Sequence, residues 1–173
     1  MRAVVIYESL TGKTERASFV LADELIRLGI PTVAYDVDGK IDLDTLAAAD
    51  LVVVGTWVSG HFIINQKPGG AGKLAHMPSI RGKRTAVFLT FAINPGKALQ
   101  KLTALVQAHG GDVIGGMEIR RDDLEGGAVE LARRLVDALA SPDPLAAPAA
   151  GEEAATTPGE AAGPDDAALE PSA

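Results

Sequence analysis

The sequence predicts an α/β protein in which one parallel sheet carries helices on both faces. Five short apolar segments rich in β-branched residues, beginning with RAVVIY at residues 2–7, suit strands that are buried on both sides. Between them lie segments in which apolar residues recur every three or four positions, as on one face of a helix. Regular alternation of strands and helices indicates a doubly wound five-stranded sheet with right-handed crossovers.

Each element has recognisable limits in the sequence. The expected strands are residues 2–7, 31–37, 50–56, 84–91 and 112–119. The expected helices are residues 14–28, 42–49, 96–111 and 124–140, with a further short helix near 71–76 inside the long loop 57–83. Gly29 ends the first helix, Asp42 caps the second, and Asp122 or Asp123 caps the last.

Charge divides the chain at residue 140. The whole chain has 16 Lys and Arg against 23 Asp and Glu, a net charge of −7. Residues 141–173 hold seven of the acids, six of the ten prolines and no Lys or Arg, so residues 1–140 are neutral (16 − 16 = 0). We therefore expect a folded domain at 1–140 and a disordered, acidic, Ala/Pro-rich tail at 141–173, which serves either as a solvating segment or as an arm that docks partners.

Composition excludes several classes of protein. The chain of 173 residues is long enough for one domain with a sizeable core. No apolar run approaches the roughly 20 residues that span a bilayer, and the N-terminus lacks the features of a signal peptide, so a cytoplasmic protein is expected. The absence of Cys excludes disulfides and thiol catalysis. No basic stripe or stacking aromatic cluster indicates nucleic acid as a partner.

Ligands of such sheets bind beyond the carboxyl ends of the strands, which here means the loops 8–14, 56–66 and 90–97. The first of these contains SLTGKT at residues 9–14, with three hydroxyls and one glycine leading into a helix. A helix start offers free N–H groups and the positive end of a dipole. With three hydroxyl donors added, this loop suits a single phosphate monoester, although hydroxyl residues also occur in ordinary helix-capping turns.

Other nucleotide motifs do not fit this loop. A Walker A loop needs a glycine at the position of Tyr7, and a Rossmann fingerprint needs two glycines besides Gly12. A receiver domain would carry paired acids after the first strand, where Glu8 stands alone, and an aspartate after the third.

After a first buried strand, SLTGKT resembles the phosphate loop of the flavodoxin family, Ser/Thr-x-Thr-Gly-x-Thr, and the resemblance extends over residues 2–140. It implies a flavodoxin-like fold with strand order 2-1-3-4-5 and FMN as the cofactor. The residues implied to bind the phosphate are Ser9, Leu10, Thr11, Gly12, Lys13 and Thr14.

The second loop opens with GTWVSG and holds the only Trp of the chain, Trp57. Flavodoxins commonly open this loop with a Thr-Trp pair, and an aromatic side chain can stack on the flat flavin ring. The resemblance implies flavin contacts by Thr56, Trp57, Val58, Ser59 and Gly60.

The third loop, TFAINPGK, departs from the family because no Tyr follows Phe91. Phe91 either covers the ring or is the last inward residue of its strand. The outer ring face is then open, closed by Ile63 or Ile64, or covered by a partner. The residues expected to contact the flavin here are Thr90, Phe91, Ala92, Asn94 and Gly96.

The second and third loops contain no Asp or Glu but do contain His61, Lys67 and Lys97. Neutral or positive surroundings favour added negative charge, so bound FMN is expected to have a higher potential for full reduction than in acidic flavodoxins. His61 is either a solvated loop residue or a proton relay, and no third ligand joins His61 and His76 to indicate a metal site. The glycine-rich segment 67–73 follows no strand and is expected to be a flexible loop.

Three functions are compatible with these features. The first is FMN-dependent electron transfer between a reductase and an acceptor protein. The second is an FMN-dependent NAD(P)H:quinone-type reductase, which an exposed ring face would suit. The third is a flavodoxin-fold binding module without redox activity, favoured by the missing third-loop aromatic. The oligomeric state is left open by the sequence.

Removal of residues 141–173 should leave the thermal unfolding midpoint nearly unchanged, because this segment has too few apolar groups to form a core. The measurement is a pair of melting curves for the full chain and for residues 1–140. A fall of many degrees would show that the tail packs on the domain.

Overall fold

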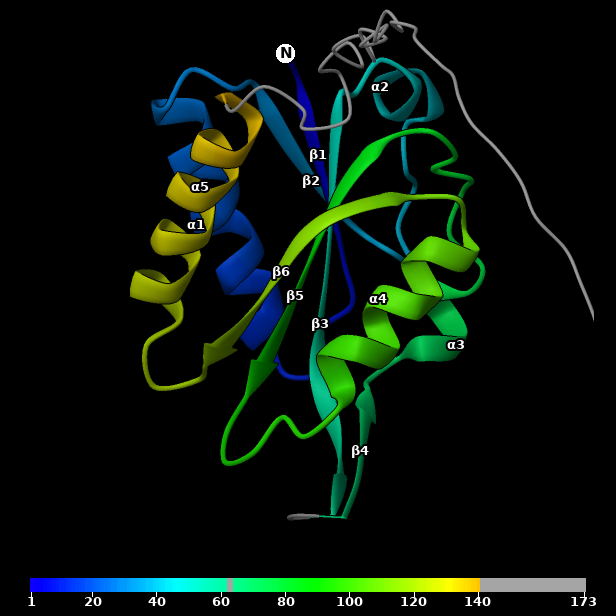
Figure 1. Cartoon of the computed structure of the whole chain (residues 1–173), viewed down its shortest axis with the longest axis vertical. Helices are drawn as coiled ribbons and strands as arrows, with labels where there is room; N and C mark the ends of the chain where they lie inside the picture. Colours follow the sequence, from blue (N-terminus) through cyan, green and yellow to red (C-terminus); the bar gives the residue numbers. More distant parts are fainter. Residues whose placement is uncertain (62–63, 141–173) are drawn as a thin grey trace, which may run out of the picture. The chain divides into compact units, whose positions relative to one another are not determined.

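The computed structural model describes residues 1–61 and 64–140. The described residues form a six-stranded sheet, in which five parallel strands follow the order β2-β1-β3-β5-β6 and β4 pairs with β3 (Figure 1). The parallel strands are β1 (Ala3–Tyr7), β2 (Thr32–Asp36), β3 (Leu51–His61), β5 (Arg84–Phe91) and β6 (Asp112–Arg120). With the parallel strands numbered alone, this is the predicted order 2-1-3-4-5.

Helices cover both faces of the sheet, as predicted (Figure 1). α1 (Lys13–Arg27) and α5 (Leu124–Ala140) pack on one face, while α2 (Leu43–Ala47), α3 (Ala71–Leu74) and α4 (Ala98–Ala108) lie on the other. Among these helices and the rest of the described chain, none is both long and apolar enough to cross a membrane.

Side chains of the central strands alternate between two apolar cores. Val5, Val53 and Phe88 contribute to the core under α1 and α5, whereas Val4 and Val52 contribute to the core under α4. This follows from the two-residue period of a strand. Because both faces are covered, every residue of β1 is buried, which explains the continuous apolar run in the sequence.

Most predicted helix limits are confirmed. Gly29 has a φ of 87°, the left-handed conformation common just past a helix end. The Asp42 carboxylate accepts a hydrogen bond from the Asp44 amide and caps α2, and Asp123 accepts from the Gly126 amide at the start of α5.

The long loop predicted at 57–83 is wrong in its first part. β3 continues to His61 and folds back as β4 (Ile64–Pro68), which pairs with it antiparallel. Trp57 is still a member of the main sheet, paired with Thr90 of β5, and the hairpin begins at the Val58–Pro68 pair. The β3–β4 hairpin, residues 58–61 and 64–68, projects from the lower end of the sheet in Figure 1.

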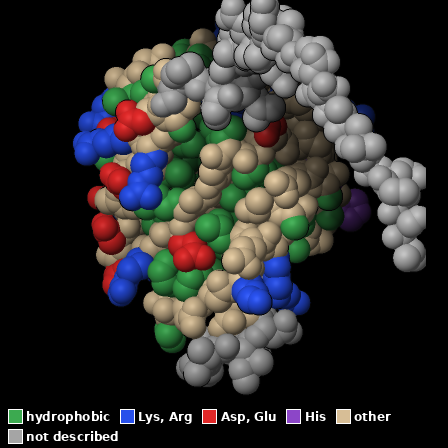
Figure 2. Space-filling view, in the orientation of Figure 1, with side chains coloured by type: hydrophobic (Ala, Val, Ile, Leu, Met, Phe, Trp, Pro, Cys, Tyr) green, Lys and Arg blue, Asp and Glu red, His purple; other side chains and the backbone are tan. Residues whose placement is uncertain are grey.

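Charged side chains of both signs are interspersed on the side of the domain formed by α1 and α5 (Figure 2). Arg134 pairs with Glu130 on α5 at 2.7 Å, and Arg16 of α1 pairs with Glu125. Exposed pairs of this kind contribute little to stability, but they accord with the neutral balance of residues 1–140.

Gly55→Ala should destabilise the domain by about 1–3 kcal/mol through overpacking. An added Cβ would overlap the ring of Phe88, which is fully buried and lies opposite Gly55 in register. Gly115→Ala is the matched control, because its Cβ would meet nothing within 4 Å. Urea denaturation curves measure both changes, and equal midpoints for the two variants would contradict the proposed contact.

Candidate functional site

The loop between β1 and α1 presents a buried hydroxyl and a helix start. Gly12 has a φ of 75° and precedes the first residue of α1. The Oγ of Ser9 is buried and has no hydrogen-bond partner among the described residues. Leu10 and Thr11 are exposed at the tip of the loop, as is Lys13 in the first turn. An orphaned buried hydroxyl is uncommon in folded proteins, and this one lies beside unpaired first-turn amides.

Thr14 connects this loop to the end of β5. Its hydroxyl lies 2.9 Å from that of Thr90, and both residues are buried. The two predicted site residues are 76 positions apart in the chain and are brought together by the fold. Since each hydroxyl carries one hydrogen and their mutual bond uses only one, the pair retains a second donor.

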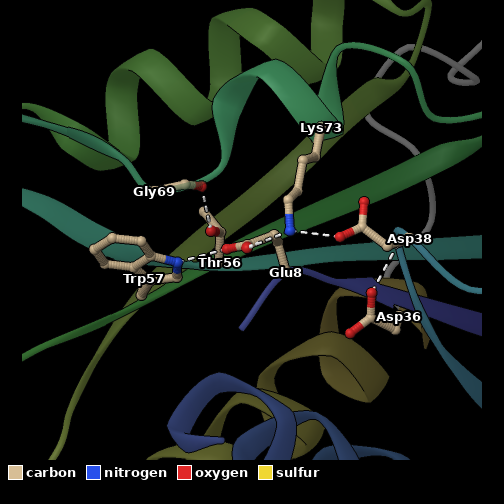
Figure 3. Close-up of polar contacts among 7 residues, drawn as sticks. All are labelled: Glu8, Asp36, Asp38, Thr56, Trp57, Gly69 and Lys73. Carbon is tan, nitrogen blue, oxygen red and sulfur yellow. Dashed lines mark hydrogen bonds and ion pairs between the residues drawn. The ribbon is translucent and has the colours of Figure 1, made fainter. Parts of the chain in front are cut away.

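Trp57 is held by a buried carboxylate. Its indole Nε1 donates to Glu8, which lies at the end of β1 and is 4% exposed (Figure 3). The Nζ of Lys73 in α3 lies 3.3 Å from the other oxygen of Glu8 and also pairs with Asp38. These hydrogen bonds, first to Asp38 and then to Glu8, raise the pKa of Lys73.

Two glycines allow this cluster to close. A Cβ on Gly69 would overlap the indole of Trp57, and a Cβ on Gly70 would overlap the carboxylate of Glu8. Thr56 donates to the Gly69 carbonyl at 2.6 Å, which holds the turn against β3 (Figure 3). The prediction of a flexible loop at 67–73 is therefore wrong, because Lys67 and Pro68 belong to β4 and residues 71–73 belong to α3. Gly69 and Gly70 form the turn between them, and their lack of side chains permits close packing over Trp57 and Glu8.

A cavity of about 320 Å³ opens between the β3–β4 hairpin and the segment after β5. It is lined by Val58, Gly60, Gln66, Ala92, Ile93, Asn94 and Arg121. Four of these residues were predicted to contact the flavin, and they come from two different loops of the sequence. The oxygen of the Asn94 side chain accepts from the Gly96 amide at 2.8 Å, which shapes the third loop.

Some predicted site residues lie outside this lining. Trp57 is turned toward Glu8 and Gly69, so one face of its ring is already covered. Phe91 is the half-buried last residue of β5, and Ser59 pairs with Lys67 in the hairpin.

The side chains of His61, Ile63 and Ile64 fall outside the described part of the chain. The expectation that His61 relays a proton, and the expectation that Ile63 or Ile64 closes the outer face of the ring, therefore stay predictions.

Sequence reasoning missed Gln66, Ile93 and Arg121. Ile93 lies in the predicted third loop but was not assigned to the site. Gln66 belongs to the unpredicted strand β4, and Arg121 follows β6, a strand whose carboxyl end also lies at this edge. The rule that ligands bind beyond the carboxyl ends of parallel strands could have identified Arg121, because it applies to every strand of the sheet.

Tyr7 is the last residue of β1, and its side chain contacts α1. Burial first, and then the nearby carboxylate of Glu15, raises the pKa of Tyr7 to about 12. Its hydroxyl lies 3.3 Å from Glu15, and its ring meets the edge of Phe19. Tyr7 is thus a neutral side chain packed against α1, in the place where a Walker A loop would need glycine.

No family model and no curated protein sequence matches the chain. Several solved structures, however, superpose on the chain. Flavodoxin 1 from Bacillus cereus superposes with a TM-score of 0.58 at 19% identity, covering 79% of this chain and 98% of that one. A mutant of the flavodoxin from Pseudomonas aeruginosa gives 0.59 at 16% identity, with coverages of 80% and 99%.

The rubredoxin oxygen:oxidoreductase of Desulfovibrio gigas superposes with a TM-score of 0.57 at 22% identity. The match covers 81% of this chain but only 37% of that larger protein. At these identities the likenesses show the fold, and the chain has a flavodoxin-like fold.

Replacing Glu8 by Ala should move the emission of Trp57 to longer wavelength and lower stability by about 1–3 kcal/mol, because the partly buried indole N–H loses its acceptor. Trp57 is the only Trp, so the fluorescence reports on this site alone. Asp23→Ala, at an exposed position of α1, is the control. Unchanged emission in Glu8→Ala would contradict the hydrogen bond.

Proposed function

We propose that the chain binds FMN non-covalently at the carboxyl edge of its sheet and transfers electrons between redox proteins. The observation that carries this proposal is the buried hydroxyl of Ser9, which has no partner among the described residues and lies beside the start of α1. Bound FMN would supply reversible uptake of one or two electrons.

The phosphate end of FMN fits the loop between β1 and α1. A terminal phosphate accepts several hydrogen bonds, and the amides of residues 10–14 together with the hydroxyls of Ser9 and Thr11 are the donors we assign to it. Lys13, exposed in the first turn, adds a positive charge. The Thr14–Thr90 hydroxyl pair holds the loop against β5.

The ring fits the cavity bordered by Val58 and Ile93. Apolar side chains would contact its faces, and the amide groups of Gln66 and Asn94 offer polar partners for its edge. Trp57 lies at the same end of β3, and we assign to flavin stacking the ring face that does not meet Gly69.

The rim of the site has exposed apolar side chains that suit electron transfer to a partner protein. Leu10 in the first loop is 68% exposed and Ile93 in the third is 71% exposed. Large apolar side chains on exposed loops provide contact area for a partner protein without strong charge pairing. The exposure of Leu10 and Ile93 therefore favours a protein, and not a small quinone, as the partner in electron transfer. Sustained NADH oxidation with a quinone by the chain alone would instead assign it to the reductases.

Ser9→Ala should weaken FMN binding by roughly 1–3 kcal/mol, the cost of removing one partner of a charged acceptor. Riboflavin, which lacks the phosphate, should bind the variant and the unchanged chain equally. Ser9 is preferred to Thr14 for this test because Thr14 also bonds Thr90, so its loss would disturb packing.

Calorimetry of the apoprotein with each flavin provides the measurement, with Ser79→Ala as a control at an exposed position. A colourless purified protein that gives no heat with micromolar FMN would refute the proposed cofactor. Equal FMN affinities for Ser9→Ala and the unchanged chain would refute the role of Ser9.

A further inference from the structure

Arg121 has a buried polar atom that the described part of the fold does not satisfy. It is the first residue after β6, and its side chain is only half-exposed. Its Nε is buried and lacks a hydrogen-bond partner within the described residues. The backbone is fixed, since the Arg121 amide donates to the Phe91 carbonyl at 2.8 Å. The unpaired Nε therefore belongs to a residue whose backbone position is fixed.

The carboxylates near Arg121 are engaged with other groups. A second cavity of about 260 Å³ lies between Arg121 and the first turn of α1, and three acids line it. Asp122 pairs with Arg120 at 2.6 Å, Asp123 caps α5, and Glu125 pairs with Arg16. None of these interactions involves Arg121.

An arginine side chain stays charged at all physiological pH values and has five N–H donors. Burying part of such a group without a partner is costly. The cost falls when an anionic or strongly accepting ligand group lies against it, because charge-assisted hydrogen bonds are strong in partly desolvated sites. The position of Arg121 is thus that of a ligand-binding residue.

The same side chain lines the 320 Å³ cavity, where it is the one charged residue among the described lining residues. No Asp or Glu borders this cavity in that set. The phosphate, by contrast, has its donors in Ser9, Thr11 and the start of α1. Arg121 therefore belongs with the ring end of the site.

We infer that Arg121 binds the flavin ring in its reduced, negatively charged form and so favours full reduction of bound FMN. This inference rests on the proposed function. Two electrons from the redox partner and one proton from solvent convert the neutral oxidised ring into a reduced ring with one net negative charge. A fixed guanidinium at the ring attracts that charge and has no corresponding charge to attract in the oxidised state.

The test compares Arg121→Gln with Arg120→Gln. Both changes remove one positive charge from adjacent positions, but Arg120 is exposed and pairs with Asp122 outside the cavity. Midpoint potentials of the FMN-loaded proteins are measured by anaerobic dithionite titration against reference dyes, together with the affinities for oxidised FMN and riboflavin. Thermal unfolding checks that each variant is folded.

In Arg121→Gln, the preference for reduced over oxidised FMN should fall roughly tenfold to a hundredfold, as expected for a lost hydrogen bond to a charged group. A tenfold loss corresponds to a two-electron midpoint about 30 mV lower. Arg120→Gln should leave the midpoint unchanged. Arg121→Lys, which keeps the charge but not the forked donor group, should give an intermediate midpoint and serves as the second variant if Gln impairs folding.

Two outcomes would overturn the assignment while leaving FMN binding intact. One is an Arg121→Gln midpoint equal to that of Arg120→Gln. The other is weaker binding of FMN but not of riboflavin with unchanged potentials, which would place Arg121 at the phosphate. If the unchanged protein binds no FMN at all, the proposed function fails and the role of Arg121 fails with it.

Discussion

The carboxylate of Glu8 organises the site beyond the sheet. It lies at the end of β1, accepts from Trp57 on β3, and meets Lys73 of α3, which reaches on to Asp38 after β2 (Figure 3). A buried carboxylate is stable only with such partners. Because Trp57 and the turn at Gly69 are fixed in this way, the β3–β4 hairpin, and with it one wall of the cavity, has a defined position.

This arrangement prepares the site before any ligand binds. The Thr14–Thr90 pair fixes the first loop against β5, and the bond from Arg121 to Phe91 fixes the loop after β6. Donors that are already in place need little reorganisation when a charged ligand binds, which favours affinity. Among the described residues of the site, the hydroxyl of Ser9 and the Nε of Arg121 are buried donors without a hydrogen-bond partner, and the Thr14–Thr90 pair retains one further hydroxyl hydrogen.

Local patterns sufficed for the parallel strands and for most of the helices, because continuous apolar runs and end signals such as Gly29 are features of short segments. The order of the strands in the sheet was predicted through the family resemblance. The β3–β4 hairpin was not predictable in the same way. The hairpin contains the exposed Gly60 and, at its base, Pro68, and its sequence shows no regular apolar alternation. Four cavity residues were predicted through the family resemblance. Ile93 lies in a predicted loop but was not assigned, and Gln66 and Arg121 depend on tertiary placement. The packing role of Gly69 and Gly70 likewise depends on Trp57 and Glu8, which lie 12 or more positions away.

The charge around the cavity links the fold to the chemistry that we propose for it. A flavodoxin-like fold alone does not set a reduction potential, since that depends on the groups nearest the ring. Here Glu8 pairs with Lys73 and lies outside the lining of the cavity, the described lining has no acid, and Arg121 contributes a cation. Coulomb interactions at such short range outweigh those with distant exposed charges, which water and salt screen. The potential is therefore expected to follow from the side chains that line the cavity.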